Sequence, residues 1–279
     1  MDSIQRGSLL VMSVWILTTF SILGVGVSRI TSSQLALAKR VEERIISQRA
    51  AEAALLHALA LRKADRTAYD TLEELGTSQE RPLGRAAFRY TMVDENSRVS
   101  LNTASQAVLA RVPGFDLDAA VAVTTSTLRP FHVIEELRAL DEKIPPETLQ
   151  RARPFLTVYG SGKVNINTAP PEVLQALGLD PGLVETILAF RTGDDKAPGT
   201  ADDRAFESAG EIVNTLRGYT SLFAAQEAAL IQLISQGLLD VRSTAVTLQV
   251  ETLFLGKPVS AYTMVLDTAQ GKVRRWSER

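Results

Sequence analysis

The chain has 279 residues, enough for one or two domains, and its 45% hydrophobic and 22% charged residues exclude a disordered or collagen-like polypeptide. The 30 basic and 32 acidic residues give a net charge of −2, which argues against a free-standing nucleic-acid-binding protein. The lack of cysteine excludes disulfides, thiolate zinc sites and cysteine nucleophiles, and two distant histidines, His57 and His132, argue against a polyhistidine metal centre.

The first expected element is a membrane-spanning helix. Residues 7–28 are uncharged, and as a helix these 22 residues span about 33 Å, which matches a hydrocarbon core of about 30 Å. A cleaved secretory signal and a buried core helix are the alternatives, but the apolar region of a signal is normally about 7–15 residues long and ends at a small-x-small site. The Lys and Arg residues that follow the span would place the C-terminal part in the cytoplasm. The segment before the span is too short for a meaningful comparison of charge, so charge alone does not fix the topology.

The start of the chain resembles that of type IV pilins and pseudopilins, in which a short leader ends in glycine (here Gly7) and a small residue (here Ser8) opens an apolar helix. In that family a prepilin peptidase, a membrane aspartyl protease, cuts after the glycine and methylates the new N-terminus. The resemblance therefore implies cleavage between Gly7 and Ser8, methylation of Ser8, and a single-pass inner-membrane protein with its body in the periplasm.

One position departs from the common pilin pattern. Most members carry a glutamate five residues into the mature chain, where this sequence has Met12. A carboxylate inside a membrane is costly and is kept only to pair with another group, here the ammonium of a neighbouring subunit. Its absence suits a filament tip, and in this family minor pseudopilin K of the type II secretion system is the member that lacks it.

A nearly continuous helix is expected from about residue 8 to about residue 63. No proline occurs between Met1 and Arg81, apolar residues recur at helical intervals, and alanine is frequent from 50 to 60. The alternative is a membrane anchor followed by a separate soluble helix, with a break at Ser32–Ser33. His57 is interpreted as a packing or surface residue rather than a ligand.

Two regions predict strands. Residues 87–93 alternate in polarity and are expected to form a hairpin with residues 98–101. Near the C-terminus, residues 246–251, 253–255, 259–266 and 273–276 predict antiparallel strands with turns between them. A lone hairpin cannot bury its face, so the late strands are its expected sheet partners.

An internal repeat lies between these regions, because residues 99–109 (VSLNTASQAVL) and 164–174 (VNINTAPPEVL) match at an offset of 65. In each copy an extended run ends at Asn-Thr and a helix begins. Thr103 and Gln106 predict a capping box, and Pro170 and Pro171 fit a first helical turn. A turn, a second helix (residues 117–126 or 183–190) and an aromatic, acidic helix start follow in each copy.

Such tandem units resemble helix-hairpin-helix modules, which hold DNA phosphates with backbone amides, so a membrane-anchored DNA receptor of the competence type is the alternative function. Charge argues against it. Residues 99–150 carry four basic and seven acidic residues, and residues 164–217 carry four and nine. Non-specific DNA affinity needs basic residues that neutralise phosphate. Asp116 and Asp180 beside the hairpins would add repulsion, so no nucleic acid partner is expected and the units are interpreted as a protein-contacting domain.

Two aspartate pairs, Asp194-Asp195 and Asp202-Asp203, lie on a Gly/Pro-containing loop between Phe190 and Phe206. Clustered carboxylates could bind Ca²⁺, which takes 6–8 oxygen ligands in irregular geometry. The spacing is not that of an EF-hand, and a solvated surface loop is the alternative. Pseudopilin K members can carry calcium in their helical domain, so the resemblance favours a metal without fixing its ligands.

Along essentially the whole chain the order of elements resembles pseudopilin K. This implies an α+β fold with a long N-terminal helix, an antiparallel pilin-like sheet and a large inserted all-α domain that contains two helix-hairpin-helix-like repeats. The expected boundaries are a leader at 1–7, a transmembrane helix at 8–28, the helix continuation and first strands at 29–102, the inserted domain at 103–236 and closing strands at 237–279.

The implied function is that of a structural subunit at the tip of the type II secretion pseudopilus, which initiates or caps assembly and supports protein export across the outer membrane. The resemblance implies minor pseudopilins I and J, the prepilin peptidase and inner-membrane lipid as partners. No Ser/His/Asp, paired-carboxylate or phosphate-loop pattern in the sequence supports catalysis, so no enzymatic activity is expected.

Overall fold

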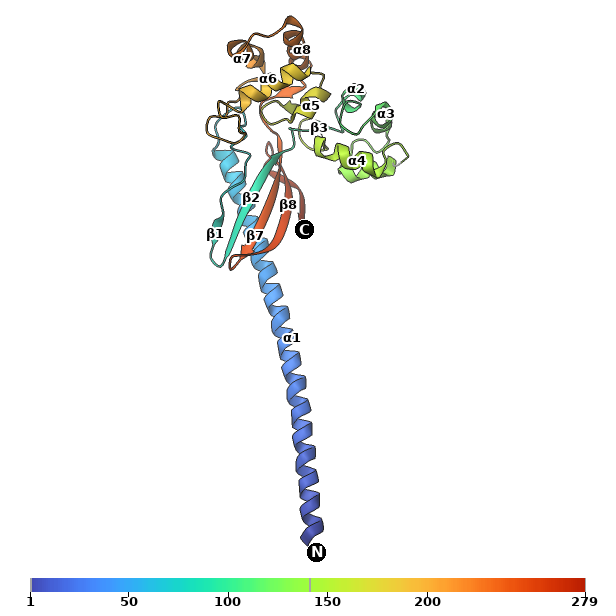
Figure 1. Ribbon diagram of the computed structural model, residues 1–279, viewed down its shortest axis with the longest axis vertical. Coiled ribbons are helices and arrows are strands. Elements are labelled where there is room, and N and C mark those ends of the chain that lie inside the picture. Colours follow the sequence, from blue (N-terminus) through green and yellow to red (C-terminus); the bar gives the residue numbers. More distant parts are fainter. Residues whose placement is uncertain (1, 141, 279) are drawn as a thin grey trace.

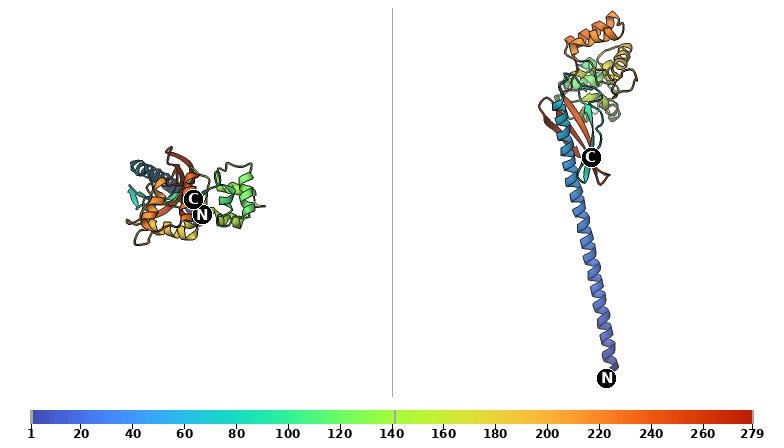
Figure 2. Two further views of the ribbon diagram at one scale, coloured as in Figure 1. Left: turned by 90° about the horizontal axis from the view of Figure 1, so that it is seen from above. Right: turned by 90° about the vertical axis from the view of Figure 1, so that its left-hand side faces the viewer.

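A single long helix dominates the shape of the molecule. The computed structural model describes the backbone of residues 2–140 and 142–278 and the side chains from residue 11 onward. Helix α1 spans Asp2–Ala64, and its 63 residues extend about 95 Å. It runs unbroken through Ser32 and Ser33, so the alternative with a break there is wrong. Figures 1 and 2 show that its N-terminal part stands free and that its last turns lie against the body.

The body contains a five-stranded antiparallel sheet in the order β1-β2-β7-β8-β9. Its strands are β1 (Arg81–Leu83), β2 (Ala86–Asp94), β7 (Ala245–Phe254), β8 (Lys257–Asp267) and β9 (Lys272–Glu278). Strand β2 pairs with β7 along its whole length, so the predicted union of early and late strands is confirmed. The predicted runs 246–251 and 253–255 merge into β7, with an irregularity between Thr252 and Leu253, except that Leu255 lies in the turn that follows the strand.

The predicted hairpin of residues 87–93 with 98–101 is wrong. Strand β2 has β1 on one side and β7 on the other, so both of its edges are occupied. After Asp94 the chain turns, with the Ser97 hydroxyl donating to the Asp94 carbonyl at 2.7 Å. Strand β3 (Val99–Ser100) therefore leaves the sheet and pairs in parallel with β4 (Leu156–Thr157).

Helix α1 packs on one face of the sheet through small residues. Ala50, Ala51, Ala54 and Ala58 are fully buried against aromatic and aliphatic side chains of β2, β7 and β8. Small side chains let the helix approach the sheet closely and also favour the helix itself. His57 Nδ1 lies 2.7 Å from the Tyr90 hydroxyl, which confirms its interpretation as a packing residue. Burial and the charge of Arg81 lower the pKa of His57.

Two helical units are inserted between β2 and β7. The first unit (residues 99–157) opens with β3 and closes with β4, and the second unit (residues 164–240) opens with β5 and closes with β6 in the same parallel manner. The first unit contains α2 (Gln106–Leu109), α3 (Leu117–Thr125), η1 (Ile134–Leu140), α4 (Pro146–Ala152) and η2 (Arg153–Phe155). The second unit contains β5 (Val164–Asn165), α5 (Pro171–Ala176), α6 (Pro181–Arg191), η3 (Ala209–Glu211), α7 (Ile212–Tyr219), α8 (Ala224–Ser235) and β6 (Leu239–Asp240).

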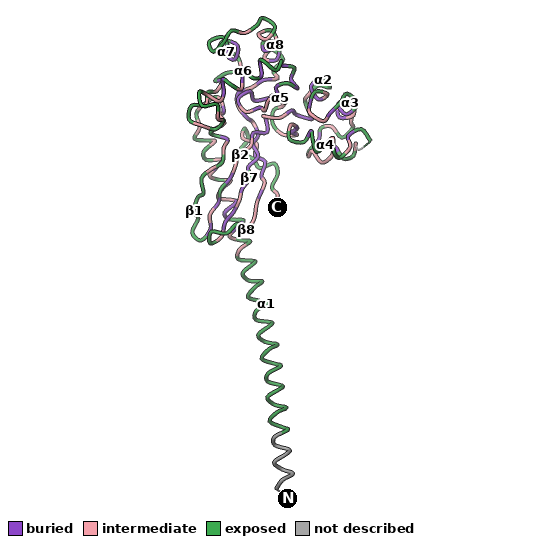
Figure 3. Tube along the Cα trace, in the orientation of Figure 1, coloured by how far each residue is buried: buried purple, intermediate pink, exposed green. Residues whose placement is uncertain are grey.

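One hydrophobic core runs through both units, and a second core lies between α1 and the sheet. Figure 1 places the units at the end of the body that faces away from the N-terminus, with the first unit projecting to one side. Figure 3 shows buried residues concentrated in the units and the sheet, whereas the free part of α1 is exposed. The expected fold class is confirmed: a long helix, an antiparallel sheet and an inserted helical region with two related repeats.

Candidate functional site

The free part of α1 has the length and composition of a membrane span. Among the described residues it is the one helix that passes this test. Its apolar side chains are exposed, including Trp15 at 70%, Phe20 at 71% and Ile22 at 73%. Met12, at the position where most pilins carry glutamate, is 62% exposed. Gly7 and Ser8 fall outside the residues whose side chains are described, so their cleavage and methylation stay predictions.

An apolar stripe continues along α1 beyond the uncharged segment. Ile30, Leu37, Val41 and Ile45 are between 50% and 63% exposed. Their spacing of seven, four and four residues places them on one side of the helix. At 100° per residue this side lies well away from the one that the buried alanines present to the sheet. The stripe is therefore available to another helix.

The asparagines of the two Asn-Thr pairs act as equivalent clamps in the two units. Asn102 donates from Nδ2 to the Phe131 carbonyl at 2.9 Å, and its Oδ1 accepts from the Phe131 N–H at 2.7 Å. Asn167 makes the same two bonds with Phe206, at 2.9 and 2.8 Å. Each side-chain amide therefore pairs with a backbone N–H and carbonyl as a neighbouring strand would. It holds the start of the third helical segment against the end of the first strand. The repeated sequence thus encodes a repeated hydrogen-bond pattern.

A second pair of equivalent contacts supports the clamps. Arg129 donates to the Ala104 carbonyl at 3.0 Å, and Arg191 donates to the Ala169 carbonyl at 2.7 Å. The two alanines are equivalent in the repeat, whereas the arginines come from different places in the two units. Sequence comparison of the repeats therefore could not identify the arginines.

The predicted capping box at Thr103 and Gln106 is wrong. Helix α2 starts at Gln106, so the residue before it, Ser105, is the N-cap, and its hydroxyl accepts from the Val108 N–H at 3.3 Å. In the second unit Pro170 is the N-cap and Pro171 the first helical residue of α5. This matches the expectation that prolines occupy the start, where a missing N–H is tolerated.

The hairpins show why these units are poor phosphate sites. Asp116 caps α3 and accepts from the Ala119 N–H at 2.8 Å, and Asp180 caps α6 and accepts from the Leu183 N–H at 3.0 Å. The N-termini that would receive a phosphate are therefore already occupied by carboxylates. A phosphate would meet negative charge at both hairpins, so the structure strengthens the argument against the DNA-receptor alternative.

The acidic loop between α6 and Phe206 is organised by one carboxylate. Asp202 Oδ2 accepts from the N–H groups of Asp194 and Asp195 at 2.8 and 3.1 Å, and its Oδ1 accepts from the Thr200 hydroxyl at 2.8 Å. These hydrogen bonds favour the charged form and lower the pKa of Asp202 to about 2. Gly193, with a φ of +62°, is required because an added Cβ would lie 2.4 Å from Asp202.

The other aspartates of the loop have separate environments. Asp194 pairs with Arg204 at 2.9 Å, and Asp203 Oδ2 accepts from the Gly199 N–H at 2.6 Å. Asp203 Oδ1 is buried and has no hydrogen-bond partner among the described residues. Four carboxylates on a loop are ligands that Ca²⁺ accepts, and the orphaned Asp203 oxygen offers an acceptor that a cation would satisfy. The structure nevertheless does not gather these carboxylates, because among the described residues no three of the four aspartates have ligand oxygens within 4.8 Å of one another. The calcium site stays a prediction.

Beneath the loop lies a buried arginine. Arg191 is 4% exposed, and its Nε has no hydrogen-bond partner among the described residues. Burial lowers the pKa of Arg191 to about 10, and the nearby charge of Asp203 opposes this shift. The side chain is therefore protonated at neutral pH and supplies a positive charge under the acidic loop.

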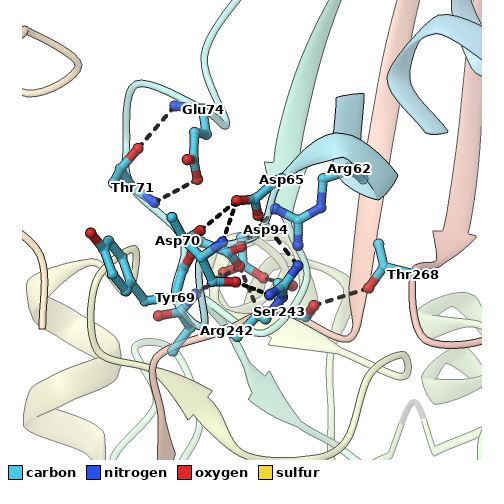
Figure 4. Close-up of polar contacts among 12 residues, drawn as sticks. Arg62, Asp65, Tyr69, Asp70, Thr71, Glu74, Asp94, Arg242, Ser243 and Thr268 are labelled. Atoms are coloured by element: carbon cyan, nitrogen blue, oxygen red, sulfur yellow. Dashed lines mark hydrogen bonds and ion pairs between the residues drawn. The ribbon is translucent and has the colours of Figure 1, made fainter. Parts of the chain in front are cut away.

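A buried polar junction joins α1, the sheet and the second unit (Figure 4). Asp70, fully buried, pairs with Arg62 of α1 at 2.6 Å and accepts from the Ser243 N–H at 2.6 Å. Asp94, at the end of β2, accepts from Asn165 Nδ2 at 2.9 Å and from the Thr168 hydroxyl at 2.5 Å. The same carboxylate accepts from the Ser243 hydroxyl.

Burial raises the pKa of Asp94, and the nearby charge of Asp70 acts in the same direction, whereas its hydroxyl and amide donors act against it. No local motif in the sequence marks this junction, because its members are spread from residue 62 to residue 243. The one local indication of a buried polar site is Asp94, which directly follows the strand pattern of residues 87–93.

Three carboxylates of the junction region, Asp65, Asp70 and Glu74, have oxygens within 4.8 Å of one another. Arg62 pairs with Asp70, and Arg242 lies 3.3 Å from Asp65. Two guanidinium groups thus already compensate the negative charge that a metal ion would require. Burial raises the pKa of Glu74. We interpret this group as part of the structural junction.

Comparisons with known proteins agree with the resemblance seen in the sequence. Residues 164–232 match the family model described as type II secretion system (T2SS), protein K. The fold is similar to a chain in the crystal structure of the GspK-GspI-GspJ complex from the enterotoxigenic Escherichia coli type 2 secretion system, with a TM-score of 0.58 and 15% identity. That match covers 89% of this chain and 99% of the other. A comparison with curated proteins gave no match. The family match lies in the second unit, and the resemblance to minor pseudopilin K is confirmed.

Proposed function

We propose that this chain is the minor pseudopilin K of a type II secretion system and occupies the tip of its pseudopilus. The observation that carries the proposal is the placement of two helical units on a pilin-like body, at the end that faces away from α1. The family match to protein K falls within one of these units. The chain would act as a structural subunit, and the only covalent chemistry would be performed on it by the prepilin peptidase at Gly7 and Ser8.

Helix α1 would serve first as a membrane anchor and then as a filament contact. Its uncharged segment fits the inner membrane, with the body in the periplasm. The exposed stripe of Ile30, Leu37, Val41 and Ile45 would pack against the helices of neighbouring subunits, because an apolar helical face of this kind gains free energy when another helix covers it.

The tip position follows from two features at opposite ends of the chain. Met12 offers no carboxylate to the ammonium of a subunit ahead of it. The two helical units widen the far end of the body, where a further subunit would otherwise stack. A subunit of this form can start or cap a filament, and its units would face the outer membrane during protein export.

The partners would be the pseudopilins I and J. The structurally similar chain comes from a complex of GspK with GspI and GspJ, and the similarity covers nearly all of both chains. If the acidic loop holds Ca²⁺, Asp194, Asp195, Asp202 and Asp203 would have to move closer together than they lie here, and the ion would then neutralise their charge and cross-link the loop.

The function is tested in a strain from which the gene for this chain has been deleted. The wild-type chain should restore secretion and co-purify with pseudopilins I and J. Val41→Asp should impair both, because it places a charge in the apolar stripe. Ser32→Asp is the matched control, since it introduces the same charge and Ser32 is exposed on the opposite side of the same helix. Normal secretion in the deletion strain, or incorporation of the chain along the filament shaft, would reject the proposal.

A further inference from the structure

The turn between β7 and β8 has an unusual residue at an exposed position. Strand β7 ends at Phe254 and β8 begins at Lys257, so Leu255 and Gly256 form a two-residue loop. Both have positive φ angles, +50° and +75°. Such loops favour Asn-Gly or Asp-Gly, because a bulky side chain is strained at positive φ. Leu255 is nevertheless 64% exposed, so the strain is not explained by packing inside this chain.

A second turn lies directly beside the first. The Leu255 N–H donates to the carbonyl of Arg85 at 3.0 Å, which joins the β7–β8 turn to the β1–β2 turn. The Arg85 guanidinium lies 4.9 Å from the ring centre of Phe254 and 3.0 Å from Glu42 of α1. Leu83, the last residue of β1 before this second turn, is 43% exposed. We call residues 83–85 and 255–257 the paired turns.

The paired turns form the end of the body that faces the membrane span. Figure 1 shows the β1–β2 and β7–β8 connections at the lower end of the sheet, where α1 emerges toward the N-terminus. Two exposed leucines, Arg85 and Lys257 therefore lie on this end. Lys39 and Arg40, both exposed, precede the turns on α1.

Charge is separated along the chain in the same sense. Residues 99–240, which hold the helical units, carry 11 basic and 18 acidic residues, whereas the rest of the chain carries 19 and 14. Residues 99–240 thus have a net charge of −7, and the remaining residues, which run through α1 and the whole sheet, have +5. In the paired turns and in residues 39–43 of α1, the basic residues Lys39, Arg40, Arg85 and Lys257 outnumber the acidic residues Glu42 and Glu43. Exposed leucines among basic residues are the pattern that binds anionic bilayer surfaces.

The geometry allows contact with such a surface. The ion pair of Arg85 with Glu42 fixes the turns near residue 42, which is 14 residues or about 21 Å beyond Ser28, the end of the uncharged segment. Headgroups occupy about 5–7 Å of this distance. If a packed layer lies about 10 Å from the helix axis, a 20° tilt toward the sheet leaves about 10 Å, roughly one Debye length. A tilt of about 40°, the upper end of the usual range, leaves about 4 Å, which extended side chains can span.

We propose that the paired turns are a docking site for anionic lipid headgroups, on which the body rests when α1 tilts in the bilayer. The inference depends on the membrane anchor of the proposed function. Leu83 and Leu255 would enter the headgroup layer, and Arg85 and Lys257 would contact lipid phosphates. In this state the helical units are held away from the anionic surface that would repel them.

The experiment uses the full chain in vesicles, and the absence of cysteine makes single-site labelling direct. Val259→Cys, next to the turns, carries a fluorophore that lipids with a headgroup spin label can quench. Thr220→Cys, at the far end of the second unit, is the matched control position. We expect strong quenching at residue 259 and none at residue 220 in vesicles of phosphatidylglycerol and phosphatidylethanolamine, and loss of quenching in phosphatidylcholine or high salt.

Substitutions separate docking from folding. Leu255→Asn should raise the melting temperature, because asparagine tolerates positive φ, and yet should reduce quenching at residue 259. Phe223→Asn, at a 74% exposed site on the far end, is the matched control and should leave quenching unchanged. Lys257→Gln should weaken docking roughly fivefold, the effect of one basic side chain near an anionic surface.

Trp15 distinguishes failure of docking from failure of the anchor. The fluorescence of Trp15 is the difference between the wild-type chain and a Trp15→Phe variant, which keeps Trp276. Lipids with brominated acyl chains should quench this Trp15 fluorescence. If Trp15 is quenched and residue 259 is not, the docking site is wrong and the anchor stands. If neither is quenched, the membrane anchor itself is wrong. Equal quenching at residue 259 in phosphatidylcholine vesicles would also overturn the proposal. So would a fluorescence change at residue 259 that appears only when pseudopilins I and J are added, because it would indicate a protein partner.

Discussion

Asn167 makes the clearest quantitative test of how the repeat works. Its side chain is 2% exposed, and it satisfies both the N–H and the carbonyl of Phe206, a fully buried residue. Asn167→Ala removes both partners and leaves two backbone groups unpaired in the core. Each unpaired buried group costs about 1–3 kcal/mol, so we expect a loss of about 3–4 kcal/mol in the free energy of unfolding.

Asn102→Ala should cost less, about 1–2 kcal/mol, because Asn102 is only half-buried and water can enter the space that its side chain leaves. Asn167→Asp keeps the shape but places a buried carboxylate oxygen against the Phe206 carbonyl, so at neutral pH its cost should be at least as large as that of Asn167→Ala. Asn214→Ala is the matched control, since Asn214 is exposed and bonds only Glu211. Its effect should stay within about 0.5 kcal/mol.

The assay is urea unfolding of the full chain in detergent, followed by near-ultraviolet circular dichroism, which reports packing of the body rather than the helicity of α1. Hydrogen exchange at the amide of Phe206 gives a local measurement, and Asn167→Ala should accelerate it most. If Asn167→Ala and Asn214→Ala have equal effects on stability and exchange, the clamp is not what holds the unit together.

Three further predictions concern local backbone and charge. Gly193→Ala should destabilise the acidic loop more than Gly199→Ala, because both glycines have positive φ but only Gly193 would clash with Asp202; protease cleavage within residues 192–204 measures the difference, and equal rates would contradict it. The pKa of Asp202 is lowered to about 2, so its contribution to loop stability is present above about pH 4 and lost as pH falls toward 2; Asp202→Asn should flatten the pH dependence of this cleavage in that window, and an unchanged profile would argue against the assignment. Leu255→Asn should stabilise the body by about 1 kcal/mol in urea unfolding, and a destabilised Leu255→Asn variant would show that Leu255 is not strained.

Local signals were enough to predict much of the fold. The 3.6-residue period and the lack of proline defined α1, and the alternation of β7 and β8 defined late strands whose exposed faces needed partners. The repeat marked the two units because each copy carries the same Asn-Thr-Ala sequence. These predictions succeeded because the residues within each segment are enough to determine its secondary structure.

The errors came where neighbours compete for one segment. Residues 98–101 look like a strand that should return along β2, but β7 takes that edge because it pairs over nine residues. Similarly, Thr103 and Ser105 are both able to cap a helix, and Ser105 is used because Asn102 holds the chain before it through Phe131. Sequence spacing does not reveal which of two suitable partners a segment will meet.

The buried junction explains how the far end of the molecule is positioned relative to α1. Asp70 binds Arg62 of the helix and the backbone of Ser243 before β7, while Asp94 binds Asn165 and Thr168 of the second unit. Breaking a buried ion pair by removing one partner costs about 3–5 kcal/mol, so movement of the unit against the helix is strongly resisted. The second unit is therefore joined rigidly to the end of α1, and a displacement of the helix along its axis would carry that unit with it.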